Sequence, residues 1–226
     1  MNPKKLIDLS HKLDPSNISI YPGDPIYTCT QTSTIPKDGY SVHTLSLGSH
    51  TGTHVDAPSH WFEHGKTIDQ IGLDMLAVRT WVIDLREIVE KGERRITWDH
   101  LSPFFTPESG SEVKKIVIIQ TGWSRYWGKP DYLQNYPFLC RRAAQELAKC
   151  GVDVLAVDTL SPDEIDGPEG YGVHEVFLGA GKVLVENLNL NELQLEGIDG
   201  NVTVSFIPLN LGGSDGAPVR AFAWSE

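Results

Sequence analysis

Residues 115–120 read KIVIIQ, a run of apolar, β-branched residues between a lysine and a glutamine, and they give the clearest structural signal in the chain. A run of this length and composition is typical of a strand that is buried on both faces of a sheet. Comparable runs occur at residues 80–85, 152–157 and 182–186. We therefore expect a mixed α/β protein with more strand than helix.

The regions around these strands complete the expected domain. A helix is predicted from Pro137 to Cys150, because apolar residues share one of its faces and a glycine follows it. Residues 202–209 and 219–224 are expected to pair as a hairpin. No linker is long enough to demand two domains, so we expect residues 1–226 to form a single one.

Composition limits the classes of partner. The chain has 226 residues, a net charge of −11 and no long basic run, which argues against nucleic acid or an anionic membrane as a partner. No window approaches a membrane span, and the N-terminus lacks the apolar core of a signal peptide. The three cysteines are odd in number and form no CxxC pair. We expect free thiols and a cytoplasmic location.

A second stretch, SHTGTHVDAPSHWFEH at residues 49–64, contains four of the eight histidines. Imidazole and carboxylate groups are ligands of zinc and other first-row divalent ions. In a straight strand the α-carbons of His50 and His54 would lie about 13 Å apart, so the chain must turn between them, and Gly52 permits that turn. We expect a bent loop that presents His50, His54 and Asp56 to one ion. A loop of merely exposed histidines is the plainer alternative.

The residues HTGTHVDAPSH resemble the HxGTHxDxPxH signature of the metal-dependent cyclase family, which includes bacterial kynurenine formamidases and isatin hydrolases. The segment HEVFLGAGKVLVENLNL, which begins at His174, is similar to the family's distal metal-ligand region. Shorter matches at residues 21–25, 121–123, 157–163 and 217–223 extend the resemblance over nearly the whole chain. The resemblance implies the family's fold, a strand-rich swivelling β/β/α domain.

The resemblance also implies a set of site residues. His50, His54 and Asp56 would hold a first ion, and Asp56 would share a second with His174 and Glu186. His60 matches the family's general base and acid. The mixed nitrogen and oxygen ligands suit zinc, manganese or iron. We expect one or two divalent ions per chain, with zinc as the first choice and manganese as the alternative.

The reaction that the resemblance implies is hydrolysis of a small amide by metal-activated water. N-formylkynurenine, which is cleaved to kynurenine and formate in tryptophan catabolism, is the first candidate substrate. An isatin-like lactam, or another lactone or amide of the family's range, is the alternative. Tyr21 stands where the kynurenine formamidases usually carry a tryptophan, and it can still stack on a flat substrate ring. The family forms dimers or larger assemblies, so a homodimer or higher homo-oligomer is expected.

Two alternatives from other classes remain. The first is a metal- or ligand-binding protein without turnover, which would have no use for the spare base His60. The second is a structural zinc site, which is usually rich in cysteine. Farther along the chain, Asp158 either holds a turn or lines the pocket.

Overall fold

The computed structural model describes residues 6–105, 115–193 and 201–224. Within these ranges the protein is built on a strongly curled sheet of nine strands. The four central strands are parallel, and the remaining pairings are antiparallel. In spatial order the strands are β1 (Ile7–Asp8), β13 (Phe222–Trp224), β11 (Asn201–Ser205), β5 (Arg79–Asp84), β7 (Ile116–Gln120), β9 (Val154–Val157), β10 (Val183–Glu186), β4 (His54–Asp56) and β12 (Gly216–Pro218).

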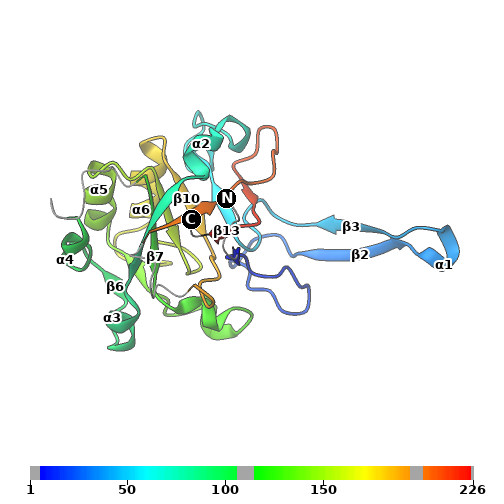
Figure 1. Ribbon diagram of the computed structural model, residues 1–226, viewed down its shortest axis with the longest axis horizontal. Helices are drawn as coiled ribbons and strands as arrows, with labels where there is room; N and C mark the ends of the chain where they lie inside the picture. Colours follow the sequence, from blue (N-terminus) through cyan, green and yellow to red (C-terminus); the bar gives the residue numbers. More distant parts are fainter. Residues whose placement is uncertain (1–5, 106–114, 194–200, 225–226) are drawn as a thin grey trace.

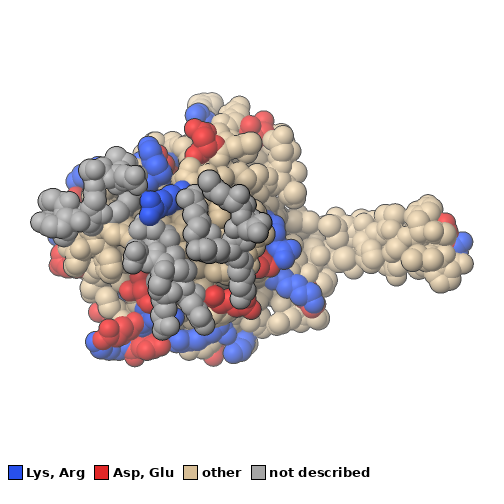
Figure 2. All heavy atoms as spheres, viewed as in Figure 1, with Lys and Arg blue, Asp and Glu red and all other residues tan. Residues whose placement is uncertain are grey.

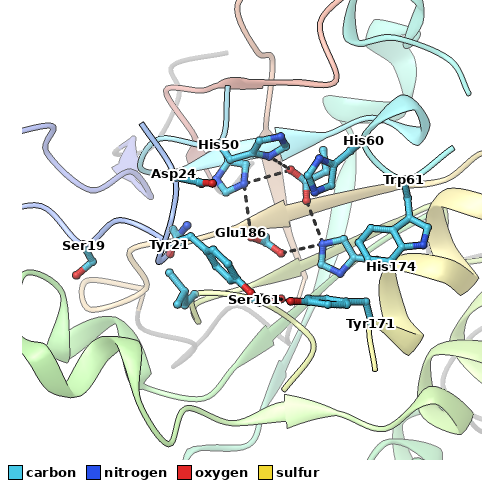
Figure 3. A pocket seen from close by; sticks show the side chains of 14 residues that line it. Ser19, Tyr21, Asp24, His50, His60, Trp61, Ser161, Tyr171, His174 and Glu186 are labelled. Carbon is cyan, nitrogen blue, oxygen red and sulfur yellow. Dashed lines mark hydrogen bonds and ion pairs between the residues drawn. The ribbon is translucent and has the colours of Figure 1, made fainter. Parts of the chain in front are cut away.

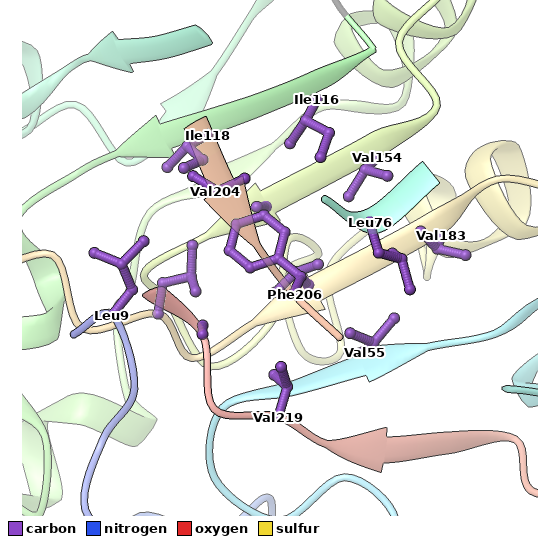
Figure 4. Close-up of a cluster of buried hydrophobic side chains, with 14 of the residues drawn as sticks. Leu9, Val55, Leu76, Ile116, Ile118, Val154, Val183, Val204, Phe206 and Val219 are labelled. Carbon is purple, nitrogen blue, oxygen red and sulfur yellow. The ribbon is translucent and has the colours of Figure 1, made fainter. Parts of the chain in front are cut away.

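The central strands bury both faces, as their continuous apolar sequences predict. In β7, Ile116 and Ile118 belong to the core inside the curl of the sheet, where Phe206 also packs (Figure 4). Val117 and Ile119 point the opposite way, into the core beneath the helices. Because successive side chains of a strand point to opposite faces of the sheet, β7 contributes side chains to both cores. The mixed α/β class expected from the sequence is confirmed.

Short helices cover one side of the sheet, and Figure 1 shows α4, α5 and α6 grouped on that side. α5 and α6 pack against each other and supply side chains to the core that lies beneath the helices. Among the described residues the helices are α1 (Ile35–Asp38), α2 (Leu73–Leu76), α3 (Arg86–Glu90), α4 (Trp98–Leu101), α5 (Arg141–Lys149) and α6 (Gly172–Gly179). The 3₁₀ turns span Pro58–His60, Ile68–Gln70, Ser102–Phe104, Trp123–Tyr126 and Pro130–Leu133. No helix in the described ranges is both long and apolar enough to cross a membrane.

The helix predicted from Pro137 begins too early. Residues Phe138–Leu139 form the strand β8, which pairs with β6 (Arg95–Ile96). Cys140 then caps α5, since its sulfur accepts a hydrogen bond from the Ala143 amide at 3.4 Å. Phe138 and Leu139 would be buried whether they formed a strand or the first turn of a helix. Their apolar pattern alone therefore does not distinguish the two.

The predicted pairing of the two final strands holds, but they do not form a simple hairpin. β11 and β13 are antiparallel neighbours, with Val204 opposite Ala223. Between them the chain crosses to the far edge of the sheet and forms β12 beside β4. Isolated bridges from Ser10 to Leu188 and from Pro208 to Val219 join segments near the two edges and help to close the curl.

A long hairpin projects from the body of the molecule (Figure 1). It consists of β2 (Thr28–Ser33), the short helix α1 at its tip and β3 (Val42–Ser46). β2 and β3 form a separate two-stranded sheet with a bulge between Gln31 and Ser33. We call residues 26–47 the arm.

Candidate metal centre

The centre is built on two neighbouring antiparallel strands, β4 and β10. Their register places His54 opposite Glu186 and Asp56 opposite Leu184. Because alternate residues of a strand share a face, His54, Asp56 and Glu186 all point away from the core that holds Val55. Each of the three side chains is buried. Strand pairing therefore concentrates two carboxylates and an imidazole on one small surface.

The turn before β4 brings His50 to the same point. Gly52 has φ of +69°, a left-handed conformation that glycine adopts without strain. The turn places the His50 and His54 rings 5.0 Å apart between centroids, so the sharp bend expected between them is present. His50 Nδ1 lies 2.7 Å from Asp56 Oδ1. Ligand atoms of His50, His54 and Asp56 lie within 4.8 Å of one another.

His174 reaches the centre from α6, which packs over the same face. Its Nδ1 lies 2.6 Å from Asp163 Oδ2. The two carboxylate oxygens of Asp163 also accept hydrogen bonds from the backbone N–H groups of Val173 and His174. Its Nε2 lies 3.7 Å from Asp56 Oδ2 and 3.5 Å from Glu186 Oε1. Asp163 therefore fixes both the first turn of α6 and the direction of the imidazole.

The donor set fits a divalent cation. A carbonyl oxygen only accepts, so the 2.8 Å contact to the Gly52 carbonyl assigns a proton to Nδ1 of His54. In the neutral ring this leaves a lone pair on Nε2, and that buried atom has no hydrogen-bond partner, as is also true of Glu186 Oε1. The two atoms belong to groups that approach within 3.5 Å. A buried nitrogen and a buried carboxylate oxygen without hydrogen-bond partners, on groups this close together, suit a bound cation.

The electrostatics of the cluster favour positive charge in the same way. Burial lowers the pKa of His50, but the charge of Asp56 and the hydrogen bond to Asp215 outweigh burial and raise it to about 11. In His174 burial is likewise outweighed, by hydrogen bonds to Asp163 and Asp56, and the pKa rises to about 10. Burial and the nearby charge of Asp56 raise the pKa of Glu186 to about 7. The carboxylates thus stabilise cations at their centre.

His60 lies at the edge of the cluster, on the 3₁₀ turn that follows β4. Its Nδ1 is 3.2 Å from Asp215 Oδ2, and the same oxygen lies 2.9 Å from His50 Nε2. Burial lowers the pKa of His60, and the opposing charge of Asp56 does not reverse this. Ligand atoms of Asp56, His60 and His174 also form a compact group. His60 is therefore placed either to move a proton or to join the ligands.

A cavity of about 260 Å³ opens above these groups, and Figure 3 shows the side chains that line it. Tyr21 and Tyr171 meet across it, with their hydroxyl oxygens 2.9 Å apart. Trp61 lies beside Tyr171, with 5.0 Å between ring centroids. These three aromatic side chains form a wall suited to a flat ring. Tyr21, the residue expected to stack on a substrate ring, thus lines this cavity.

Sequence reasoning missed four residues of this site. Asp163 and Asp215 hold the imidazoles, and Trp61 and Tyr171 line the cavity. Asp163 is the last residue of segment 157–163 and Asp215 lies two residues before segment 217–223, both noted in the sequence, but neither aspartate has a local spacing that marks it. Asp158 is fully buried and accepts hydrogen bonds from Thr121 and Gly122, so it holds a turn.

Comparisons with known proteins identify the family of this chain. A family model described as "Putative cyclase" matches residues 7–164. The chain belongs to this cyclase family. A kynurenine formamidase from Bacillus cytotoxicus is 28% identical over 222 residues, which cover 98% of each chain. The resemblance to the family inferred from the sequence is confirmed.

Solved structures share the fold of this cyclase-family protein. Isatin hydrolase A from Labrenzia aggregata, bound to benzyl benzoate, superposes with a TM-score of 0.85 at 24% identity, covering 97% of this chain and 93% of that chain. A structure described as a potential metal-dependent hydrolase with cyclase activity gives a TM-score of 0.78 at 24% identity, with 98% of each chain covered. At these identities the likeness establishes the fold.

Proposed function

We propose that this protein is a metal-dependent amidohydrolase that cleaves a small aryl amide, with N-formylkynurenine as the first substrate. The observation that carries the proposal is the convergence of three imidazoles and two carboxylates at the base of a cavity walled by aromatic rings. The 28% identity to a kynurenine formamidase over nearly the full length supports the choice of substrate.

We assign the ion to the residues that converge in the cluster. His50, His54 and Asp56 would hold one ion, and Asp56, His174 and Glu186 would hold a second or complete the shell of the first. Zinc is the ion we expect, and manganese is the alternative, because both accept mixed nitrogen and oxygen ligands. When bound, such an ion supplies Lewis acidity toward the carbonyl and lowers the pKa of water.

His60 and Asp215 would transfer the proton of the attacking water. Asp215 accepts the Nδ1–H of His60, which leaves Nε2 free to take a proton from the attacking water. The same nitrogen returns the proton to the departing amine nitrogen as the C–N bond breaks. The lowered pKa of His60, which follows from its burial, keeps the imidazole neutral and ready to accept that proton near neutral pH.

A neutral lactam such as isatin is the second candidate, and the charges of the cavity favour it. The described residues that line the cavity include Asp24, Asp56 and Glu186 but neither lysine nor arginine. Asp24 suits the ammonium group of N-formylkynurenine, whereas the carboxylate of that substrate meets no lysine or arginine among these residues. Isatin carries no such carboxylate.

The test is to measure the metal content of protein purified without chelator, together with hydrolysis of N-formylkynurenine and of isatin. Bound zinc with formamide turnover supports the first proposal, and isatin opening supports the second. His60→Ala should retain the metal and the thermal stability while losing turnover. Protein that takes up no divalent ion would overturn both proposals. Metal binding with unchanged turnover in His60→Ala would remove His60 from the mechanism.

A further inference from the structure

Charge on the face of the molecule in Figure 2 is mixed, with acidic and basic side chains close together over the body of the protein. This face therefore favours neither sign of charged ligand. A more specific set of polar contacts lies in the interior, where Asn187 follows Glu186 at the end of β10. Asn187 is 3% exposed, lines the cavity and has φ of +57°, a left-handed conformation that asparagine adopts more readily than most residues. A buried amide of this kind needs hydrogen-bond partners.

The side-chain amide of Asn187 joins two parts of the fold. Its Nδ2 lies 3.1 Å from the carbonyl oxygen of Gly52, and its Oδ1 lies 2.8 Å from the hydroxyl oxygen of Tyr132. Because a carbonyl oxygen only accepts, the amide NH₂ group faces Gly52 and the amide oxygen faces Tyr132. Tyr132 is fully buried and donates its hydroxyl proton to that oxygen. The tyrosine thus fixes the direction in which the amide points.

The oxygen that Asn187 contacts is also the oxygen that orients His54. The Gly52 carbonyl accepts a hydrogen bond from Nδ1 of His54 at 2.8 Å as well as the one from Asn187. Two donors occupy both lone pairs of that oxygen. The backbone carbonyl of Asn187 in turn accepts a hydrogen bond from Oγ1 of Thr53 at 2.6 Å. The turn that precedes His54 is therefore held by both the side chain and the main chain of Asn187.

We propose that Asn187 is a positioning residue of the metal centre, which fixes the Gly52 carbonyl and thereby the direction in which Nε2 of His54 faces the ion. The inference rests on the proposed function, since it takes His54 as a ligand of a divalent ion. An imidazole whose Nδ1–H is held by a fixed acceptor presents its other nitrogen in one direction, so less order has to be gained when the ion binds. Tyr132 acts through the same amide.

Asn187→Gly isolates the side chain, because glycine adopts the positive φ freely and keeps the carbonyl that Thr53 contacts. We expect the metal-free variant to bind zinc about tenfold more weakly than the parent protein, measured by competition with a chromophoric chelator.

Asn135→Gly is the matched control. Asn135 also has a positive φ, of +56°, but its side chain is exposed and does not line the cavity. This variant should bind zinc as tightly as the parent. Equal zinc affinity in Asn187→Gly and the parent, or an equal loss in the two glycine variants, would overturn the assignment of Asn187 while leaving the proposed function intact. A parent protein that bound no divalent ion would overturn both.

Tyr132→Phe supplies a readout that a general loosening of the fold would not produce, and it keeps the test decisive if Asn187→Gly does not fold. Removing the hydroxyl frees the Asn187 amide to turn, so zinc affinity should fall by at least about threefold. In the double variant with Asn187→Gly the amide is already gone, so we expect no loss beyond that of Asn187→Gly alone. Zinc affinity unchanged in Tyr132→Phe, or losses in the double variant that multiply as if independent, would contradict a shared network.

Discussion

Asp163 Oδ2 lies 2.6 Å from Nδ1 of His174, and this contact fixes which nitrogen of the imidazole faces the centre. Asp163 is 3% exposed and belongs to the loop before α6, so the pair is shielded from water. A carboxylate that accepts the second N–H of a ligating histidine orients the ring and raises its basicity.

Replacing Asp163 should therefore weaken metal binding. We expect Asp163→Asn to lower zinc affinity by about 10–100-fold, measured by competition with a chromophoric chelator. Glu164→Gln is the control, since Glu164 instead pairs with Arg94 at 3.5 Å. Equal affinity in Asp163→Asn and in the parent protein would contradict a role for Asp163 in holding His174.

Asp215 should affect turnover as well as metal binding, because it contacts both His60 and the proposed ligand His50. It accepts from both His50 and His60, and the hydrogen bond to His50, opposed by partial burial, holds the pKa of Asp215 well below its usual range. Asp215→Asn leaves a weaker, neutral partner for His60. We expect kcat per bound metal to fall by at least about tenfold, in addition to the weaker metal binding that follows from the lost charge beside His50. Loss of the ion with unchanged kcat per bound metal would instead make Asp215 a support of the metal site.

The hydroxyl pair of Tyr21 and Tyr171 should influence substrate choice. Tyr171→Phe removes one hydroxyl and leaves the aromatic wall in place, so we expect stability to change by only about 0.5–1.5 kcal/mol. The ratio of kcat/KM between N-formylkynurenine and isatin is expected to change, because the remaining Tyr21 hydroxyl loses its partner 2.9 Å away. A ratio equal to that of the parent would show that the pair is only structural.

The buried side chain of His11 should make the free energy of unfolding depend on pH. It is 7% exposed, its ring stacks on Trp127 with 4.1 Å between centroids, and burial lowers its pKa to about 3. The unfolded chain takes up this proton near pH 6.5 and the folded chain only near 3, so the stabilisation is complete above 6.5 and declines as the pH falls below it.

We test this with His11→Phe, which keeps an aromatic ring against Trp127. Between pH 7.5 and 5, the parent should lose about 2 kcal/mol more unfolding free energy than the variant. Urea unfolding in the presence of a chelator measures the difference without a contribution from bound metal. Parallel stability curves for the two proteins would show that His11 is not held neutral by the fold.

Replacing Gly52 tests the role of the turn between His50 and His54. A side chain there would meet Leu13 Cδ2 at 2.4 Å, and the positive φ is unfavourable for any other residue type except asparagine and aspartate. We expect Gly52→Ala to cost about 1 kcal/mol or more of unfolding free energy and to weaken metal binding, since the carbonyl of Gly52 orients His54. Thermal unfolding and metal competition measure the two effects, and a variant unchanged in both would contradict the role of the bend.

Local sequence pattern is enough to specify several elements of this protein. The apolar runs specified β5, β7, β9 and β10, because a strand buried on both faces needs an unbroken apolar sequence. Gly52 and the even spacing of His54 and Asp56 predicted a bent segment with converging side chains. Even so, the same patterns placed the start of α5 too early, at Pro137, since burial of Phe138 fits a strand equally well.

The distant groups that complete the site are brought together by the pairing of strands that lie far apart in the sequence. The pairing of β4 with β10 places Glu186 opposite His54, and the crossing of the chain to β12 brings Asp215 to His50 across 165 positions of sequence. Nothing in the local sequence fixes strand order or register, because these depend on the burial of the whole curled sheet. The exposed arm was likewise visible only in three dimensions, since its alternating strands resemble any half-buried hairpin until the rest of the fold leaves them uncovered.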